Sequence, residues 1–112
     1  MSTIEFNQCD VLVDALYGTG FNRKFDYESS AVMQTINKLN SYKIACDIPS
    51  GINPNGECDK DTFVADITLT MGALKKSMFT DSAKEFVGKI RVLDLGVTRS
   101  IYEGKSNWNL LD

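Results

Sequence analysis

Short apolar runs recur along this chain, and each ends close to a glycine, a proline or an aspartate. The first run extends from Val11 to Leu16 and is followed by Gly18-Thr19-Gly20. Continuous apolar runs of this length are typical of strands buried on both faces of a parallel sheet, whereas a buried helix would need a longer run. We therefore predict a strand from Val11 to Leu16.

A helix is predicted next, because apolar residues recur there at helical spacing. These positions are Val32, Met33, Ile36 and Leu39. Asp26 can cap the amino end by accepting hydrogen bonds from free backbone amides, and the pattern ends near Asn40. The sequence thus predicts one helix of about three turns.

Three further strands are predicted, from Ile44 to Ile48, Asp66 to Met71 and Lys89 to Leu95. A strand, a helix and a strand joined by short loops form a right-handed βαβ unit, so the expected class is α/β with a mostly parallel sheet. The long loop after Pro49 has the length at which loops are often functional. Residues from Leu74 to Ala83 fit either a short irregular helix or a loop.

The predicted elements include too few helices for their strands. Four parallel strands need helices on both faces, and the pattern indicates one convincing helix. Either a partner chain covers the rest, or the chain is a piece of a larger domain. We expect the uncovered sheet edge to promote self-association.

Composition narrows the class of protein. The 112 residues suit one domain, and a net charge of −3 without a basic stripe does not favour nucleic-acid binding. Three cysteines without a CxxC pair favour a reducing cytoplasm, and the absence of histidine excludes a histidine-based triad or the usual zinc site. No apolar run approaches roughly 18 residues and no signal peptide is recognised, so no membrane association is expected.

Asp14 and Asp47 are the strongest candidates for chemistry, because each lies at the end of a predicted strand. Ligands of parallel α/β sheets bind at the carboxyl ends of strands. Asp14 could bind a cation or a hydroxyl group, or it could simply cap backbone amides. Asp47 precedes the tight turn Pro49-Ser50-Gly51, where a raised pKa would suit an acid or base.

Weaker candidates surround these aspartates. Gly18-Thr19-Gly20 is a fragment of a glycine-rich loop, and Arg23 and Lys24 could meet a phosphate, although a solvated loop explains them equally. Ser50 could offer an oxygen to a monovalent cation. No nearby base would activate its hydroxyl as a nucleophile, so a serine hydrolase is not expected. Lys75 follows a predicted strand end and could face a ligand, although most lysines so placed are solvated, and the Lys75-Lys76 pair suits a solvated helix start.

Three stretches in order resemble a known family: VDALYGTGFNRK, ACDIPSGI and ADITLTMGALKKS. Over about residues 8–98 the chain resembles the NAD(P)H-hydrate epimerase family, the N-terminal domain of the YjeF type. The resemblance implies a Rossmann-like αβα sandwich and the interconversion of the R and S forms of hydrated NADH and NADPH. It also implies dependence on potassium.

The resemblance assigns roles residue by residue. It implies that Asp14 and Ser50 bind potassium, and that Asp47 contacts the substrate and is catalytic, as a proton donor or a guide for water. The remaining substrate contacts would come from the glycine-led loop, which comprises Gly18, Thr19, Gly20, Phe21, Asn22, Arg23 and Lys24.

The chain departs from the family pattern in two places. Leu74 stands where the family usually has a proline, which weakens any role for Lys75. The family's asparagine-asparagine-glycine-glycine-aspartate loop, which grips the substrate phosphates, has no counterpart in Met1 to Cys9. The chain therefore resembles the C-terminal half of the domain. We expect it to be inactive alone and to form a homo-oligomer or associate with the N-terminal half.

The expected organisation is a partial epimerase domain over residues 1–100 and a tail or linker over residues 101–112. The tail resembles the linker toward an ADP-dependent dehydratase domain in bacterial bifunctional repair enzymes. The alternative is a non-catalytic Rossmann-like binding or scaffold module, in which Asp14 and Asp47 only cap backbone amides. A kinase-like domain is a weaker alternative, because a phosphate-gripping lysine loop is absent.

Overall fold

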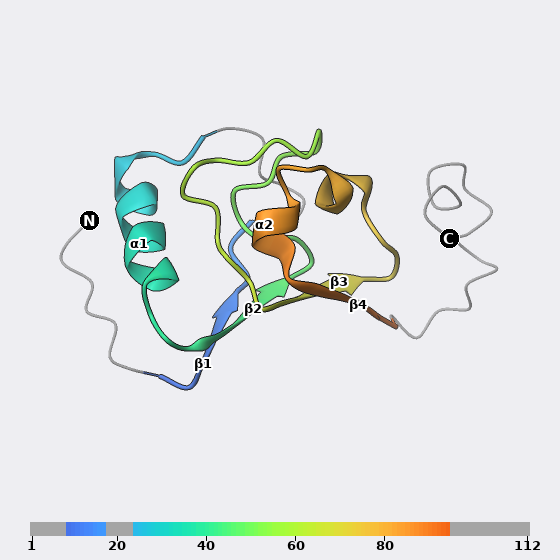
Figure 1. The fold of residues 1–112 in the computed structure, drawn as a ribbon, viewed down its shortest axis with the longest axis horizontal. Coiled ribbons are helices and arrows are strands. Elements are labelled where there is room, and N and C mark those ends of the chain that lie inside the picture. The colour runs from blue at the N-terminus through green and yellow to red at the C-terminus, as the bar shows by residue number, and fades with distance from the viewer. Residues whose placement is uncertain (1–8, 18–23, 95–112) are drawn as a thin grey trace.

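The computed structural model describes residues 9–17 and 24–94, which form a four-stranded parallel sheet with helices (Figure 1). The strand order is β1-β2-β3-β4, the same as the order along the chain. The strands are β1 (Val11–Asp14), β2 (Tyr42–Cys46), β3 (Ile67–Met71) and β4 (Lys89–Leu93). The predicted α/β class and parallel sheet are confirmed.

The strand bounds differ from the prediction at both ends of β2. The strand begins at Tyr42, whose amide donates to the Asp10 carbonyl at 2.8 Å, rather than at Ile44. It ends at Cys46 rather than Ile48, because Asp47 has a φ of 71° that no strand residue adopts. The first strand likewise stops at Asp14, before Leu16.

Helix α1 (Tyr27–Asn37) covers one part of the sheet. Asp26 caps it as predicted, with its carboxylate accepting from the Ser29 amide at 2.8 Å. The helix ends at Asn37 rather than near Asn40. The Asn37 side chain then accepts from the Val64 amide at 2.9 Å and donates to the Thr62 carbonyl at 3.0 Å, which fastens the helix end to the β2–β3 loop.

The connection from β3 to β4 contains the short 3₁₀ helix η2 (Lys76–Phe79) and helix α2 (Lys84–Val87). The segment left open by the sequence, Leu74 to Ala83, is therefore partly helical. Helix α2 was not predicted. It has a single turn, which tertiary packing rather than propensity must stabilise.

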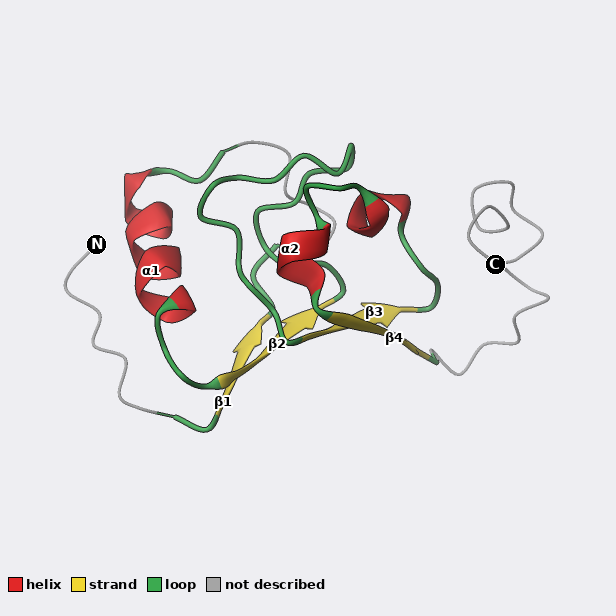
Figure 2. Cartoon of the chain, viewed as in Figure 1, coloured by secondary structure: helices red, strands yellow, loops and turns green. Residues whose placement is uncertain are grey.

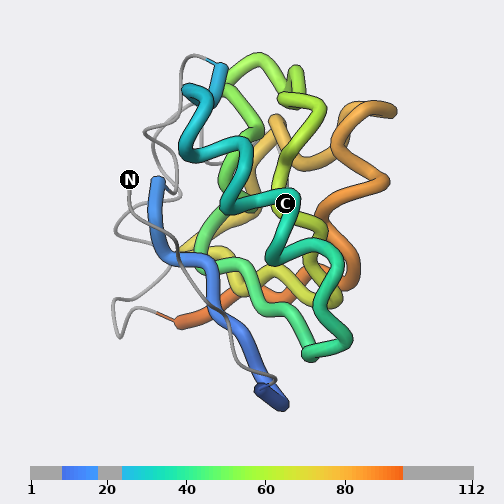
Figure 3. Tube along the Cα trace, turned by 90° about the vertical axis from the view of Figure 1, so that its left-hand side faces the viewer, coloured from blue at the N-terminus to red at the C-terminus, as the bar shows by residue number. Residues whose placement is uncertain are grey.

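Helices and loops lie on one side of the sheet (Figure 2). Parallel crossovers are right-handed, so strands added always in the same direction place every connection on the same face. Figure 3 views the molecule from the side of α1 and β1. Among the described residues, nothing covers the opposite face, where Val13 remains 55% exposed. The predicted shortage of helices is thus confirmed for the part of the chain that the structure describes.

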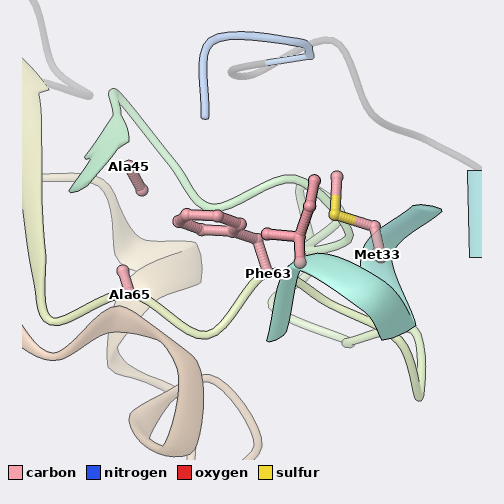
Figure 4. Packing of buried hydrophobic residues seen from close by; sticks show 5 residues of the cluster. Met33, Ala45, Phe63 and Ala65 are labelled. Atoms are coloured by element: carbon pink, nitrogen blue, oxygen red, sulfur yellow. The ribbon is translucent and has the colours of Figure 1, made fainter. Parts of the chain in front are cut away.

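Two small cores lie under these connections. The first is built around Phe63, whose ring points toward Ala45 of β2 (Figure 4), and includes Met33 and Ile36 of α1. The second joins the two short helices to the turn after β2, and its members are Ile48, Ile52, Met78, Ala83 and Val87. In neither described stretch, 9–17 or 24–94, is any helix long and apolar enough to cross a membrane.

Candidate functional site at the carboxyl ends of the strands

The candidate residues gather at the carboxyl ends of β1, β2 and β3. Asp14 is the last residue of β1, and Asp47 directly follows β2. The Asp47 amide donates to the Leu69 carbonyl of β3 at 2.7 Å, so the ends of β2 and β3 remain connected at this edge. In parallel α/β proteins this is the edge where ligands bind.

Asp14 and Ser50 form a buried pair. Asp14 is 4% exposed and Ser50 is fully buried. The Ser50 amide donates to Asp14 Oδ2 at 2.6 Å and the Ser50 hydroxyl donates to Asp14 Oδ1 at 2.7 Å. The Leu16 amide adds a third bond, at 3.2 Å to Oδ1. The pair therefore ties the end of β1 to the turn after β2.

These oxygens meet the requirements of a potassium site only in part. Carboxylate and hydroxyl oxygens are the donor type that hard cations select. Both Asp14 oxygens already accept hydrogen bonds, and no group of three or more His, Cys, Asp or Glu side chains suited to a metal occurs in residues 9–17 and 24–94. Asp14 and Ser50 would thus supply part of a coordination shell, and their metal role stays a prediction.

The backbone of Asp47 adopts an unusual conformation. Its φ is 71°, and the Ile48 amide donates to the Cys46 carbonyl at 2.9 Å across it. This three-residue turn with a positive φ at its centre is the rare and strained kind of γ-turn. Strained non-glycine residues persist where the surroundings hold them, and they cluster at functional sites. The turn directs the Asp47 side chain toward the end of β3.

The Asp47 carboxylate is held by one of its two oxygens. Oδ1 lies 2.9 Å from Lys75 Nζ and accepts from the Met71 amide at 3.1 Å and the Thr70 hydroxyl at 3.2 Å. Among the described residues, no hydrogen bond to Oδ2 is found. The side chain is 21% exposed. One carboxylate oxygen is thus fixed by hydrogen bonds, whereas the other accepts none from the described residues.

The expected raised pKa of Asp47 is wrong. Burial raises the pKa of this carboxyl, but the Met71 amide, the Lys75 ammonium and the Thr70 hydroxyl together outweigh it, so the pKa lies below the ordinary value of 3.8. Asp47 is therefore ionised at neutral pH. It is suited to accept a proton or a hydrogen bond rather than to donate a proton.

Lys75 corrects a second expectation. The sequence suggested a solvated side chain, but the Lys75 ammonium is only 20% exposed and pairs with Asp47. Lys76, by contrast, is exposed as expected. The sequence offered one signal that Lys75 matters, its place just after the end of a parallel strand. The partner in contact with it could not be identified from spacing.

Most of the remaining predicted site residues lie where the structure gives no description. Gly18, Thr19, Gly20, Phe21, Asn22 and Arg23 lie outside the described residues, as does the tail at residues 101–112. Lys24 is exposed. The three cysteines are free thiols, and a cytoplasmic location stays a prediction.

A parallel α/β sheet with acidic side chains gathered at the carboxyl ends of its strands defines a partial Rossmann-like domain, the class of fold in which ligands bind at that edge. The family model described as the YjeF-related protein N-terminus matches residues 1–77. The chain belongs to this family, as its motifs suggested.

Named relatives agree with this assignment. The chain is 42% identical over 105 residues to the bifunctional NAD(P)H-hydrate repair enzyme of Helicobacter pylori, an alignment covering 94% of this chain and 22% of that protein. It is 35% identical over 92 residues to the NAD(P)H-hydrate epimerase of Elusimicrobium minutum, covering 81% of this chain and 41% of that protein. The chain thus spans less than half the length of either relative.

Proposed function

We propose that this chain carries part of the active site of an NAD(P)H-hydrate epimerase, which interconverts the R and S forms of hydrated NADH and NADPH. The observation that carries the proposal is the ionised Asp47, fixed through Oδ1 at the carboxyl edge of the sheet in a chain of this family. The names of its relatives supply the substrate.

The reaction inverts C6, the ring carbon that bears the hydroxyl. The C6–O bond breaks as the ring nitrogen lone pair forms an iminium, and the departing hydroxide takes a proton from solvent. Water then adds to the opposite face and loses a proton. The Asp47 carboxylate accepts the proton of the incoming water and favours the cationic iminium beside it, since opposite charges attract strongly in a partly buried site. Asp47 then returns this proton to solvent, so the cycle consumes one water, releases one water and leaves the number of protons unchanged.

The proposal also includes a bound cation. Asp14 and Ser50 would contribute oxygen ligands to potassium, and the bound ion would offset the negative charge of the substrate phosphates. Because the relative from Helicobacter pylori is a bifunctional NAD(P)H-hydrate repair enzyme, we also propose a dehydratase activity for the complete gene product.

The epimerase is tested by incubating the complete gene product with purified R epimer and following the S epimer by chromatography, with potassium and with sodium. We expect turnover that potassium increases, and little turnover by this chain alone. Asp47→Asn should lower kcat/KM by about 100-fold or more, the usual contribution of a positioned acid or base. Asp81→Asn, which changes a fully exposed carboxylate, is the matched control and should leave the rate unchanged.

The rival function is a non-catalytic binding or scaffold module. The internal bonds of Asp14 to Ser50 favour it, because a carboxylate that caps a turn needs no ligand. Epimerisation that persists unchanged in Asp47→Asn would end the catalytic assignment of Asp47, whereas the absence of epimerisation by the complete wild-type gene product would support the rival.

A further inference from the structure

We propose that Lys75 is the positioning residue of the site, which holds the Asp47 carboxylate by Oδ1 so that Oδ2 faces the ligand. The role of Asp47 toward a substrate rests on the proposed function. The contact between Lys75 and Asp47 does not, because the geometry of the described residues shows it directly.

The ammonium group of Lys75 has no donor left for a substrate. Lysine has three N–H donors. Its Nζ lies 2.6 Å from the Met71 carbonyl, 3.0 Å from the Ala73 carbonyl, 3.0 Å from the Thr70 hydroxyl and 2.9 Å from Asp47 Oδ1. Acceptors therefore outnumber donors. Lys75 acts through Asp47 rather than on the reacting atoms.

The chain brings Lys75 to this position by a tight turn after β3. Gly72 has a φ of 75°, and the Ala73 amide donates to the Met71 carbonyl at 2.8 Å. The chain then returns, so that the Lys75 side chain bonds the carbonyls of the turn it has just left. These bonds fix the ammonium independently of Asp47. A fixed cation can orient a carboxylate at little cost in conformational entropy.

The contact is also the only charged one that bears on Asp47 among the described residues. The other groups that lower the pKa of Asp47 are the Met71 amide and the Thr70 hydroxyl, which are neutral. Removing the Lys75 charge therefore leaves a half-buried carboxylate with neutral donors only. Its charged form should become less favoured, while its place at the strand end is kept by the γ-turn.

The first measurement needs no substrate. The pKa of Asp47 is read from the carboxyl carbon in an NMR titration of this chain, for the wild type, Lys75→Met and Lys75→Gln. We expect both variants to raise the pKa of Asp47 by about one unit or more, the usual effect of an opposite charge at this distance. Lys75→Gln keeps a donor for the turn carbonyls, so it remains informative if Lys75→Met does not fold. Lys76→Met, at the exposed neighbour, should leave the pKa unchanged.

The second measurement uses the complete gene product. Lys75→Met should lower kcat at least 10-fold with little change in KM, and Lys75→Arg should recover part of the loss. Because the ionised form of Asp47 is active, the acid limb of the pH profile should move to higher pH by the shift seen in the titration.

The two measurements separate two kinds of failure. A wild-type protein without epimerase activity would end the proposed function and leave the titration result intact. An Asp47 pKa that does not change in Lys75→Gln, or an active enzyme whose kcat and acid limb ignore Lys75→Met, would overturn the positioning role.

Discussion

The two aspartates at the site differ in their partners, and this difference sets what each can do. Asp14 is bonded by the neutral donors of Ser50 and Leu16, whereas Asp47 is bonded by an ammonium and two neutral donors. Asp14 therefore keeps a local structure together. Asp47 carries a compensated charge, and one of its oxygens accepts no hydrogen bond from the described residues.

A prediction at the residue scale concerns pH. The pKa of Asp47 is lower in the folded chain than the ordinary 3.8, so its ionised form favours folding above that value. This contribution is lost as the pH falls through the folded-state pKa. Asp47→Asn should therefore destabilise the chain more at pH 7 than in acid. Urea unfolding at a series of pH values measures the difference.

Asp81→Asn provides the comparison for that experiment, because Asp81 pairs with Lys84 only at a fully exposed surface. Its free energy of unfolding should follow that of the wild type at every pH. A destabilisation by Asp47→Asn that is the same at all pH values would show that the charge of Asp47 does not contribute.

Residue-level features were partly accessible from sequence. The places of Asp14, Asp47 and Ser50 near strand ends follow from apolar runs that stop at turns. The contact of Lys75 with Asp47 does not follow, because it depends on the turn at Gly72 and on the register of β2 and β3. The lowered pKa of Asp47 was missed for the same reason, since burial alone raises it and the lowering comes from the Met71 amide, the Lys75 ammonium and the Thr70 hydroxyl.

At the scale of elements, the conformation of the turn that follows β2 depends on a close contact between Gly51 and Thr62. Gly51 has a φ of 114°, and a Cβ there would lie 2.4 Å from Thr62 Oγ1 and 2.8 Å from Thr62 Cα. A methyl group would collide with backbone as well as side chain. The Gly51 position thus keeps Ser50 where it can bond Asp14.

Gly51→Ala should accordingly destabilise the chain by about 1–3 kcal/mol, the range for a non-glycine residue held in an unfavourable conformation. Thermal and urea unfolding measure the loss. Asn55→Ala, an exposed change in the same loop, should have an effect of less than about 0.5 kcal/mol. Equal stabilities of the two variants would contradict the tight contact with Thr62.

Some residues and elements could not be predicted from the pattern of apolar positions. Residue Lys43 belongs to β2 although it is charged, because its ammonium is buried against the carbonyls of Leu39 and Ser41. A pattern of apolar residues cannot reveal such a strand residue. Helix α2 was missed because its single turn carries no periodicity, and its burial of Val87 depends on the distant Ile48 and Ile52.

At the scale of the whole molecule, the two faces of the sheet differ in cover and in the residues they carry. Register places one alternate set of strand residues on the face without cover. In β1 to β3 this set is apolar: Val11, Val13, Tyr42, Ile44, Cys46, Ile67, Leu69 and Met71. The covered face instead buries polar residues such as Thr68 and Thr70. An exposed apolar surface of this kind favours association.

This chain alone should therefore self-associate as its concentration rises, as its sheet edges also suggest. Sedimentation velocity should show a mean mass that increases with concentration, and Val13→Lys should reduce the increase. Ser82→Lys adds the same charge at an exposed position outside the sheet and should change nothing. A clean monomer at high concentration would contradict the prediction.

Because the strands follow one another across the sheet in chain order, the protein can be divided beside β1. Since β1 to β4 are added one after another, no connection between them crosses the outer edge of β1. A separate polypeptide that contributes a parallel strand beside β1 and helices for the bare face would interrupt none of these connections. The site at Asp14 would then lie at the seam between the two pieces. Epimerase activity that is restored when separately expressed fragments are mixed would identify this chain as one component of a split enzyme.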